Sequence, residues 1–376
     1  MSHGFAPTID DLPMTATFAA QEPVSVGIVG CGFVTLRHHL PAIAAIPGAR
    51  VVALADCDAG ALERAGEMAS RAVLHARAAA LLEDARVEAV AICTPVGSHA
   101  ELTLAALSAG RHVLVEKPLA ADLAEADALV EAAARGGLVA GVGFKYRRHR
   151  LVAMAVEIVR SGELGPLRLV ETAFTSDSRR NALRANGWRG DRARGGGSIL
   201  EQAVHHFDLW RLLTGSEVTR VTALASGGDA ASAISAEMED GVIASTIACD
   251  DAGLNHDVRI HGRDGTLTVR LDRFDGVEVV PAGALPGDVP RRIARGVRLA
   301  RSLPAMARSH RAGGDITAAD AAQWQAFAEA VRGGAPFEPG LADGRAALAV
   351  ALAAIESAET AMVVRPSREA TLAVVA

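Results

Sequence analysis

Two segments far apart in the sequence carry side chains suited to proton chemistry on a hydroxyl group. Lys117 follows the apolar run 112–115, and His205 comes four residues after Glu201. Histidine titrates near neutral pH and can remove a hydroxyl proton, while a lysine cation stabilises the alkoxide that develops. If residues 198–210 are helical, Glu201 and His205 share one face, where the carboxylate would orient the imidazole and favour its protonated form. We therefore interpret His205 as an acid–base group and Lys117 as its electrostatic partner.

A glycine-rich turn near the start of the sequence is suited to binding a pyrophosphate. Gly30 and Gly32 follow the apolar run 24–29 and precede a helical stretch. The first glycine permits a tight turn, the second lets backbone N–H groups approach the anion, and the helix N-terminus adds a positive dipole end. Thr35 occupies the third small position of the G-x-G-x-x-G pattern, a departure expected to loosen the packing of helix on strand. The residues predicted to bind the dinucleotide here are Gly30, Cys31, Gly32, Phe33 and Val34.

An acidic residue after the next apolar run fits the ribose of the same ligand. Asp56 lies 21 residues beyond Thr35, where a carboxylate accepts hydrogen bonds from ribose hydroxyls. No arginine adjoins it to pair with a 2′-phosphate, so the sequence favours NAD over NADP, although Arg37 or Arg64 could change that preference. The alternative interpretation is that Asp56 only caps the following helix.

Alternating apolar runs and helical stretches predict the elements that position these residues. Short strands are expected at 24–30, 51–55, 89–93, 112–115 and 139–143, with helices between them, which is typical of a parallel sheet. After residue 144 the strand-like runs are 166–174, 217–226, 233–249, 255–261 and 265–271, separated by turns, which indicates a largely antiparallel sheet. We expect an irregular segment over 281–314 and helices near 317–332 and 341–360.

Composition and charge narrow the class of protein. A chain of 376 residues with 50% hydrophobic and 22% charged residues predicts two folded domains. The formal net charge of −6 argues against a nucleic-acid binder. The four cysteines form no CxxC pair, so neither a disulfide framework nor a zinc knuckle is expected, and reduced thiols favour the cytoplasm. No apolar run is long enough to predict a transmembrane helix.

Two further motifs complete a recognisable order along the chain. Thr94 and Pro95 end the predicted strand 89–93, with His99 four residues after Pro95, and Glu116, Lys117 and Pro118 end the strand 112–115. With the glycine turn, Asp56, and the block Gly195-Gly-Gly-Ser-Ile-Leu-Glu-Gln-Ala-Val-His-His-Phe-Asp208, the chain from about Val24 to residue 365 resembles the glucose–fructose oxidoreductase, inositol dehydrogenase and MocA-like family.

The resemblance implies a fold and an activity. The fold class is α/β: an N-terminal Rossmann domain with a parallel sheet, plus a C-terminal α+β domain with a large, mostly antiparallel open sheet. The domains expected are a flexible leader (1–23), an NAD-binding domain (24–144) and a substrate-binding and oligomerisation domain (145–376). The implied activity is NAD(P)-linked oxidation or reduction of a carbon of a sugar or cyclitol, in a homodimer or homotetramer.

Site residues are carried over from the family position by position. Lys117 matches the active-site lysine and His205 the acid–base histidine, while Glu201 stands where many relatives have aspartate. The expected cofactor contacts beyond the glycine turn are Asp56, Thr94, Pro95, His99, Glu116 and Lys117. The expected substrate contacts are Lys117, Tyr146, Trp188, Arg189, Glu201 and His205. His206 and Asp208 are interpreted as structural, and no metal is predicted, because their spacing matches no strong ligand motif.

Two arginine-rich segments modify the charge argument. Residues 179–194 contain six Arg and one Asp, and residues 291–311 contain seven Arg and no acid. The first segment predicts an anionic substrate, such as a nucleotide sugar or a uronic-acid derivative, against the alternative of a solvated loop. The second would be an amphipathic surface helix, but Gly296 and Pro304 interrupt it, so peripheral contact with anionic lipid or a partner is not the favoured interpretation.

The function predicted from these features is that of a cytoplasmic NAD-dependent oxidoreductase acting on a small carbohydrate or cyclitol. Two alternatives remain at this point. Some relatives use bound NAD for redox-assisted glycoside hydrolysis, and others are catalytically silent regulators that keep the nucleotide-binding fold. The presence of both Lys117 and His205 speaks against a silent protein.

Overall fold

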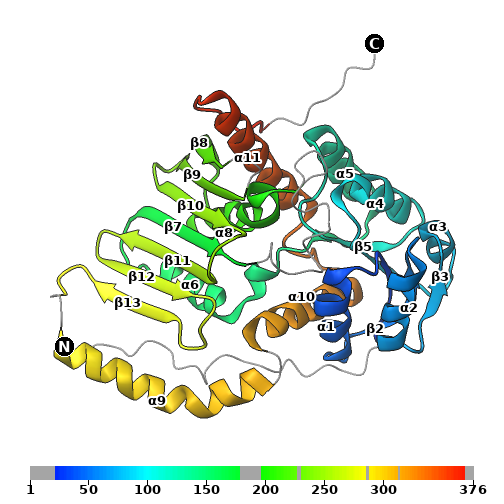
Figure 1. Cartoon of the computed structure of the whole chain (residues 1–376), viewed down its shortest axis with the longest axis horizontal. Helices are drawn as coiled ribbons and strands as arrows, with labels where there is room; N and C mark the ends of the chain where they lie inside the picture. Colours follow the sequence, from blue (N-terminus) through cyan, green and yellow to red (C-terminus); the bar gives the residue numbers. More distant parts are fainter. Residues whose placement is uncertain (1–21, 178–195, 227–229, 285–287, 312–313, 369–376) are drawn as a thin grey trace.

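The computed structural model describes residues 22–177, 196–226, 230–284, 288–311 and 314–368. Two sheets, each with its own helices, lie side by side (Figure 1). Sheet A is built from the N-terminal part of the chain and sheet B from the C-terminal part. The predicted fold class is therefore confirmed.

Sheet A has six parallel strands in the order β3-β2-β1-β4-β5-β6. They are β1 (Val24–Val29), β2 (Ala49–Ala55), β3 (Val73–His75), β4 (Ala89–Ile92), β5 (His112–Val115) and β6 (Ala140–Val142). Their connections include α1 (Leu40–Ala44), α2 (Ala59–Met68), α3 (Ala78–Leu82), α4 (His99–Ser108) and α5 (Leu123–Gly136). The chain order reverses between β1 and β4, and open α/β sheets bind ligands at such a point, beyond the strand C-termini. Of these six strands only β3 was not predicted, because its three residues, two half-buried and one exposed, are too few to give an apolar run.

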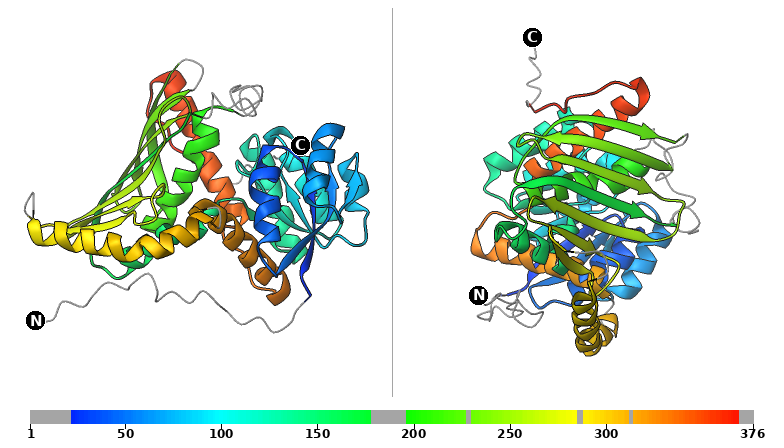
Figure 2. Two further views of the ribbon diagram at one scale, coloured as in Figure 1. Left: turned by 60° about the horizontal axis from the view of Figure 1, so that its bottom comes forward. Right: turned by 90° about the vertical axis from the view of Figure 1, so that its left-hand side faces the viewer.

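Sheet B has seven strands in the order β13-β12-β11-β7-β10-β9-β8. They are β7 (Leu167–Thr175), β8 (Val218–Ala225), β9 (Ala231–Met238), β10 (Ile243–Cys249), β11 (Asn255–Gly262), β12 (Gly265–Arg270) and β13 (Val277–Pro281). The β7–β10 pair is parallel and the other pairs are antiparallel. The helices α6 (Arg150–Arg160), α8 (Val204–Thr214) and α11 (Leu341–Thr360) cover one face, and among the described elements none covers the other, open face (Figure 2).

The segment predicted to be irregular contains a long helix instead. α9 (Val289–Arg311) runs through both Gly296 and Pro304 without a break. Most of its remaining residues are Ala, Arg and Leu, which are strong helix formers, and their summed preference outweighs one glycine and one proline. The expectation that these two residues interrupt the helix is therefore wrong.

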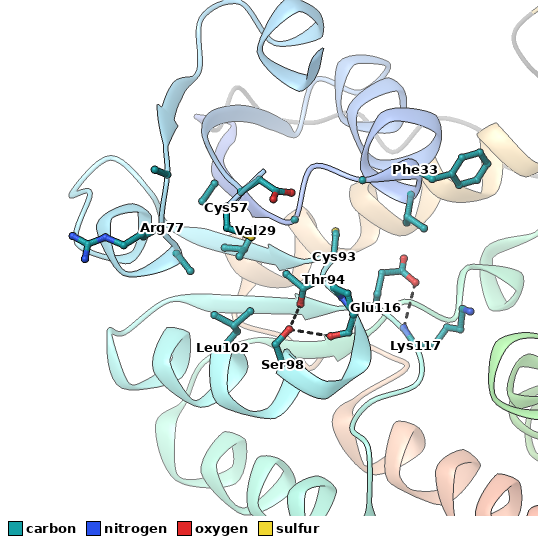
Figure 3. A pocket seen from close by; sticks show the side chains of 18 of the residues that line it. Val29, Phe33, Cys57, Arg77, Cys93, Thr94, Ser98, Leu102, Glu116 and Lys117 are labelled. Carbon is teal, nitrogen blue, oxygen red and sulfur yellow. Dashed lines mark hydrogen bonds between the residues drawn. The ribbon is translucent and has the colours of Figure 1, made fainter. Parts of the chain in front are cut away.

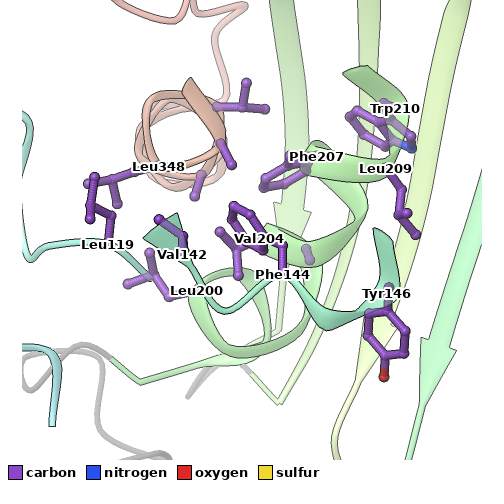
Figure 4. Packing of buried hydrophobic residues seen from close by; sticks show 14 of the residues in the cluster. Leu119, Val142, Phe144, Tyr146, Leu200, Val204, Phe207, Leu209, Trp210 and Leu348 are labelled. Atoms are coloured by element: carbon purple, nitrogen blue, oxygen red, sulfur yellow. The ribbon is translucent and has the colours of Figure 1, made fainter. Parts of the chain in front are cut away.

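Apolar packing joins the two sheets into one body. Phe144 and Val142 from the end of β6 pack with Val204 and Phe207 of α8 and Leu348 of α11 (Figure 4). Phe144 and Phe207 are fully buried. This packing fixes the helix that carries His205 against the C-terminal ends of the sheet A strands.

The helix α10 (Gly314–Gly333) returns from sheet B to the first domain. Its Trp324 and Phe327 belong to the same buried cluster as Val26 and Ile28 of β1. Part of the sheet A core thus comes from residues more than 280 positions later in the chain. The division at residue 144 remains a prediction.

Candidate active site

A cleft of about 590 Å³ lies beyond the C-terminal ends of β1, β2, β4 and β5 (Figure 3). Volumes of this size are usual for cofactor and substrate sites. The lining residues include Gly30, Gly32, Phe33, Val34, Asp56, Cys57, Arg77, Thr94, Pro95, Glu116, Lys117 and Glu201. Nearly all the residues predicted from the glycine turn and the two later motifs are therefore brought together.

The two glycines of the turn have different roles. Gly30 has φ of +94°, and a Cβ there would lie 2.6 Å from the Cys93 carbonyl oxygen, so both conformation and space require glycine. A Cβ on Gly32 would meet no atom within 4 Å, because this residue borders the cleft. The turn therefore leaves space for an anion close to its backbone N–H groups, as a pyrophosphate requires.

Thr35 closes the glycine turn through its own side chain. Its side chain is fully buried and its hydroxyl donates a hydrogen bond to the Gly30 carbonyl oxygen. The helix that follows the turn has π-helical hydrogen bonding over Thr35–His39, within the segment that runs into α1. The hydroxyl at the third small position of the pattern is thus part of the turn itself.

The Asp56 carboxylate is hydrogen-bonded to the backbone of the glycine turn. It accepts hydrogen bonds from the backbone N–H of Cys31, at 2.6 Å, and of Asp58, at 2.8 Å. Asp58, not Asp56, caps α2 by accepting from the Ala61 N–H. Asp56 therefore lies at the cleft beside the turn, and the interpretation of it as a helix cap is not the arrangement observed.

Arg77 was missed because it follows the short, unpredicted strand β3. It lines the same cleft as Asp56 and Cys57. A guanidinium here can lie against adenine or pair with a phosphate, so Arg77 bears on the choice between NAD and NADP. Because Arg77 is distant from Asp56 in the sequence, no motif around Asp56 indicated that it lines the cleft.

Glu116 is held by a chain of buried polar groups. The Trp324 indole N–H donates to Nδ1 of His39 at 3.0 Å. Because an indole nitrogen can only donate, the His39 proton resides on Nε2, which donates to Glu116 Oε1 at 3.0 Å. Burial opposes ionisation of Glu116, but this hydrogen bond and the surrounding positive charges, including those of Lys117 and Lys145, outweigh it and lower the pKa of Glu116. Glu116 is therefore a fixed negative charge beside Lys117.

His99 links two of the loops that form the cleft. It is buried, and its ring nitrogens lie 2.8 Å from the Pro118 carbonyl oxygen and 2.9 Å from that of Thr94. It thereby connects the loops after β4 and β5, but it is not among the residues that line the cleft. The predicted contact of His99 with the cofactor remains a prediction.

Lys117 joins the first domain to the second. Its Nζ donates to the Glu201 carbonyl oxygen at 2.9 Å and lies 3.4 Å from the Glu201 Oε2 atom. Glu201 is on the π-helical turn Ile199–Ala203, directly before α8. The two residues predicted to act with His205 therefore contact each other across the domain boundary.

His205 is almost completely buried, with 7% of its surface exposed. Its ring packs edge-on against Tyr146, with the centroids 4.8 Å apart, and against Phe144 at 5.8 Å. Among the residues that the structure describes, none hydrogen-bonds to its Nδ1. Burial and then the positive charges of Lys117 and Lys145 hold the pKa of His205 well below its usual value. The expectation that a carboxylate favours the protonated form is therefore wrong, and the imidazole is neutral.

The adjacent His206 points to sheet B. Its Nδ1 lies 2.6 Å from the Thr246 hydroxyl, and its Nε2 lies 3.4 Å from Nε2 of His256. Burial lowers the pKa of His206 to about 3. His256, which sequence reasoning missed, also packs edge-on against Tyr146 at 4.6 Å.

Asp208 belongs to an ion-pair network rather than to the cleft. Arg147 donates to both of its carboxylate oxygens, at 2.8 Å from Nε and 2.5 Å from Nη2. Asp343 of α11 contacts the same guanidinium at 3.0 Å. Within the described ranges, no three His, Cys, Asp or Glu side chains are grouped as a metal site. Trp188, Arg189 and the rest of the arginine-rich segment 179–194 lie outside the described residues.

Comparison with known proteins adds independent information. Residues 24–144 match the model of an oxidoreductase family with an NAD-binding Rossmann fold, and residues 152–268 match the GFO/IDH/MocA C-terminal domain. The chain is 31% identical over 282 residues to dTDP-3,4-didehydro-2,6-dideoxy-alpha-D-glucose 3-reductase of Streptomyces violaceoruber, covering 68% of this chain and 80% of that protein. It is 30% identical over 353 residues to inositol 2-dehydrogenase 1 of Saccharopolyspora erythraea, covering 89% of this chain and 94% of that one.

A solved structure supports the fold. Levoglucosan dehydrogenase in complex with NADH and levoglucosan superimposes with a TM-score of 0.77 at 22% identity, over 92% of this chain and 100% of that one. At this level of identity the likeness concerns the fold alone. No helix within the described residues is both long enough and apolar enough to cross a membrane.

Proposed function

Because the chain belongs to the Gfo/Idh/MocA family of oxidoreductases, we propose that it transfers a hydride between NAD and a secondary hydroxyl or keto carbon of a sugar, nucleotide sugar or cyclitol. It is an NAD(P)-dependent enzyme of the kind that acts on CH–OH groups. The observation that carries the proposal is the contact of Lys117 with Glu201 at the cleft. This contact joins the glycine-turn domain to the helix that bears His205.

The cleft has the features that a dinucleotide needs. The open space above Gly32 and the preceding turn would hold the pyrophosphate, and Asp56 would accept hydrogen bonds from the adenosine ribose. Lys117 and Glu116 lie at the opposite part of the lining, after β5. A bound nicotinamide supplies the hydride acceptor or donor for the reaction.

The protein groups would manage the proton. Neutral His205 can accept the proton of the substrate hydroxyl, and its buried position keeps bulk water from competing. The Lys117 cation would stabilise the oxyanion that develops as the proton leaves. Glu201, which lies 3.4 Å from the Lys117 Nζ, holds the lysine in place. In the direction of reduction, His205 would return the proton to the keto oxygen.

Asp56 favours NAD as the cofactor. Its carboxylate lines the cleft beside the turn and would repel a 2′-phosphate placed near the ribose. Arg77, at the same part of the cleft, is the residue that could accommodate such a phosphate. The preference for NAD therefore depends on the balance of these two charges.

The arginine-rich segment 179–194 supports an anionic substrate. It precedes the Gly196–Gly197 turn that leads to Glu201 and His205, so its six arginines lie close to the site along the chain. One relative acts, by its name, on a dTDP-linked sugar, which carries phosphates. Substituting Arg189, Arg192 and Arg194 together should raise KM for charged substrates only, and an unchanged KM would exclude this role.

The quaternary structure and location follow as proposals. Sheet B exposes Leu224 and Ile247 on its open face, with 74% and 55% of their surfaces accessible, which supports a homodimer or homotetramer formed through this face. Light scattering on the purified chain would measure the subunit number. The reduced thiols support a location in the cytoplasm.

A substrate panel tests the function. The full chain would be incubated with NAD or NADP and with polyols, aldoses, cyclitols and nucleotide sugars, and the near-ultraviolet absorbance of the reduced nicotinamide would be followed. We expect net reduction of NAD with at least one hydroxyl substrate. Release of a free sugar from a glycoside without net reduction would identify a hydrolase, and binding of NAD without any turnover would identify a silent regulator.

A further inference from the structure

The helix α9 exposes apolar side chains along its outer side. Val289, Ile293 and Val297 recur every four residues, with 62%, 63% and 48% of their surfaces exposed. Leu303 follows on the same side and is 49% exposed. A surface helix normally turns such a stripe towards the core, so this arrangement needs a different explanation.

The contacts of α9 fix which side faces the molecule. Ser302 is buried, and Ser309 donates a hydrogen bond to Asp315, at 2.9 Å. Asp315 is held in turn by Arg150 of α6 at 2.9 Å. Ser302 lies nine residues after Ile293, which is two and a half helical turns at roughly 100° per residue, so the two side chains point in opposite directions. The apolar stripe therefore points away from the rest of the protein.

The charge of this helix has a single sign. The segment 291–311 contains seven arginines and no acidic residue. Of these, Arg301, Arg308 and Arg311 are exposed. At helical spacing, Arg301 and Arg308 border the stripe on the side of Val297. The helix lies along the outside of the molecule beside β13, and its N-terminal end is far from the first domain (Figures 1 and 2).

We propose that α9 binds the surface of an anionic lipid membrane, with the stripe Val289, Ile293, Val297 and Leu303 inserted among the acyl chains and the flanking arginines on the lipid headgroups. An apolar face bordered by basic residues is the pattern of helices that lie in a membrane interface. With an outward stripe of about 20 Å, α9 can lie flat on such a surface. The inference is independent of the proposed catalytic function, because α9 contributes no residue to the cleft.

Charge and shape favour an anionic membrane over two other binding partners, a nucleic acid and a second copy of the chain. A nucleic acid would contact basic side chains at the centre of the outer face, where residues 289–303 of α9 present apolar ones. Pairing of α9 with α9 of a second copy would place two helices of the same charge together, with no acidic residue on either to offset the repulsion. A negatively charged lipid surface complements both the charge and the apolar stripe.

Vesicle sedimentation tests the proposal. The full chain would be centrifuged with vesicles of phosphatidylcholine alone or of phosphatidylcholine with an equal amount of phosphatidylglycerol. We expect binding to the mixed vesicles, weakened by added salt, and little binding to phosphatidylcholine alone. The double variant Ile293→Glu with Val297→Glu should bind at least about tenfold less, because it places two charges in the acyl region.

The matched control changes the same charge elsewhere. Leu254→Glu with Met362→Glu alters two residues that are 69% and 65% exposed and lie outside α9, and it should bind like the unaltered chain. Equal thermal melting and equal NADH binding would show that both variants are folded. Equal binding to the two kinds of vesicle, or full binding by the α9 variant, contradicts the proposal. A smaller number of subunits for the α9 variant alone, measured by light scattering, would also contradict the proposal, because the stripe would then be a contact between copies.

Discussion

The two walls of the cleft are built in different ways. On the side of sheet A, the turn at Gly30 and the carboxylate of Asp56 are fixed by backbone conformation and by hydrogen bonds to nearby backbone N–H groups. On the opposite side, Lys117 meets Glu201 across 84 residues of sequence, and the surroundings of His205 come from three separate elements. The first wall is thus a local structure, while the second exists only when both domains are assembled.

Two adjacent histidines show the same contrast within one helix. His205 packs against Tyr146 and Phe144, and the charge of Lys117 contributes to lowering its pKa, whereas His206 contacts Thr246 and His256 of sheet B. Both are buried and both have lowered pKa values. Burial alone therefore does not distinguish a candidate catalytic group from a structural one. What distinguishes them is the positive charge of Lys117, which contributes to the lowered pKa of His205 and not to that of His206.

The largest expected effect comes from the second wall. His205→Ala and Lys117→Ala should each lower kcat by roughly 10²–10⁴-fold, because the proton acceptor or the oxyanion-stabilising charge is lost. The affinity for NADH, measured by fluorescence titration, should change little, since the first wall is intact. Near-normal turnover in both variants would refute the assigned roles.

His206→Asn is the matched control for this prediction. The asparagine amide can keep the hydrogen bond to Thr246, and His206 points to Thr246 and His256 of sheet B rather than to Tyr146 and Phe144. We expect kcat to stay within a few-fold of the unaltered value. A loss as large as that of His205→Ala would mean that the two histidines act as a unit.

The next prediction separates effects on stability from effects on cofactor binding at the two glycines of the first wall. Gly30→Ala places a Cβ at φ of +94° and 2.6 Å from a backbone oxygen, so we expect a loss of at least about 1–3 kcal/mol in the free energy of unfolding. Gly32→Ala adds a methyl group in open space, so stability should hold while NADH affinity falls. Denaturant unfolding and NADH titration of both variants measure the two quantities. Equal destabilisation by both substitutions would contradict the assignment.

A smaller effect concerns the choice of cofactor. Asp56→Asn removes the negative charge near the expected ribose position and should weaken NAD binding by about tenfold, with a weaker effect on NADP. Arg77→Ala should act in the opposite sense and weaken NADP more than NAD. Dissociation constants for both cofactors, compared between the two variants, give the result. A parallel loss for both cofactors in both variants would exclude a role in selectivity.

The first wall could be predicted from the sequence because its signals are local. The glycines, Asp56, Thr94, Pro95 and Glu116 each lie at or just after the end of an apolar strand, and parallel strands bring their C-terminal ends to one edge. Apart from β3 and β13, the strands of both sheets followed from the same apolar runs. β3, and with it Arg77, was missed because the strand has only three residues, of which Leu74 is exposed. β13 was missed because its residues are half-buried or exposed.

The second wall was predicted only in part. Lys117, Glu201 and His205 could be named from a resemblance, but their contacts depend on packing between distant segments. The sequence spacing of Glu201 and His205 suggested a carboxylate that raises the pKa of the histidine, whereas in the folded chain Lys117 lies beside Glu201 and burial lowers that pKa. The contribution of Trp324 to the support of Glu116 has no local signal, because α10 reaches sheet A only through the tertiary fold.

An effect confined to acidic pH distinguishes the buried structural histidine by the pH dependence of stability. His206 has a folded-state pKa of about 3, below the value of about 6.5 for an unfolded chain, so the unfolded state binds more protons between these values. The free energy of unfolding therefore includes a contribution that is complete above about pH 6.5 and is lost as pH falls towards 3. His206→Asn removes this contribution and should reduce the slope of stability against pH by up to about 1.4 kcal/mol per pH unit in that window.

Urea unfolding at several pH values measures the slope, and His310→Asn, on the exposed side of α9, provides the control. An unchanged slope in His206→Asn would show that the proton is taken up elsewhere, most directly by His256, whose ring lies next to that of His206 and whose pKa burial also lowers.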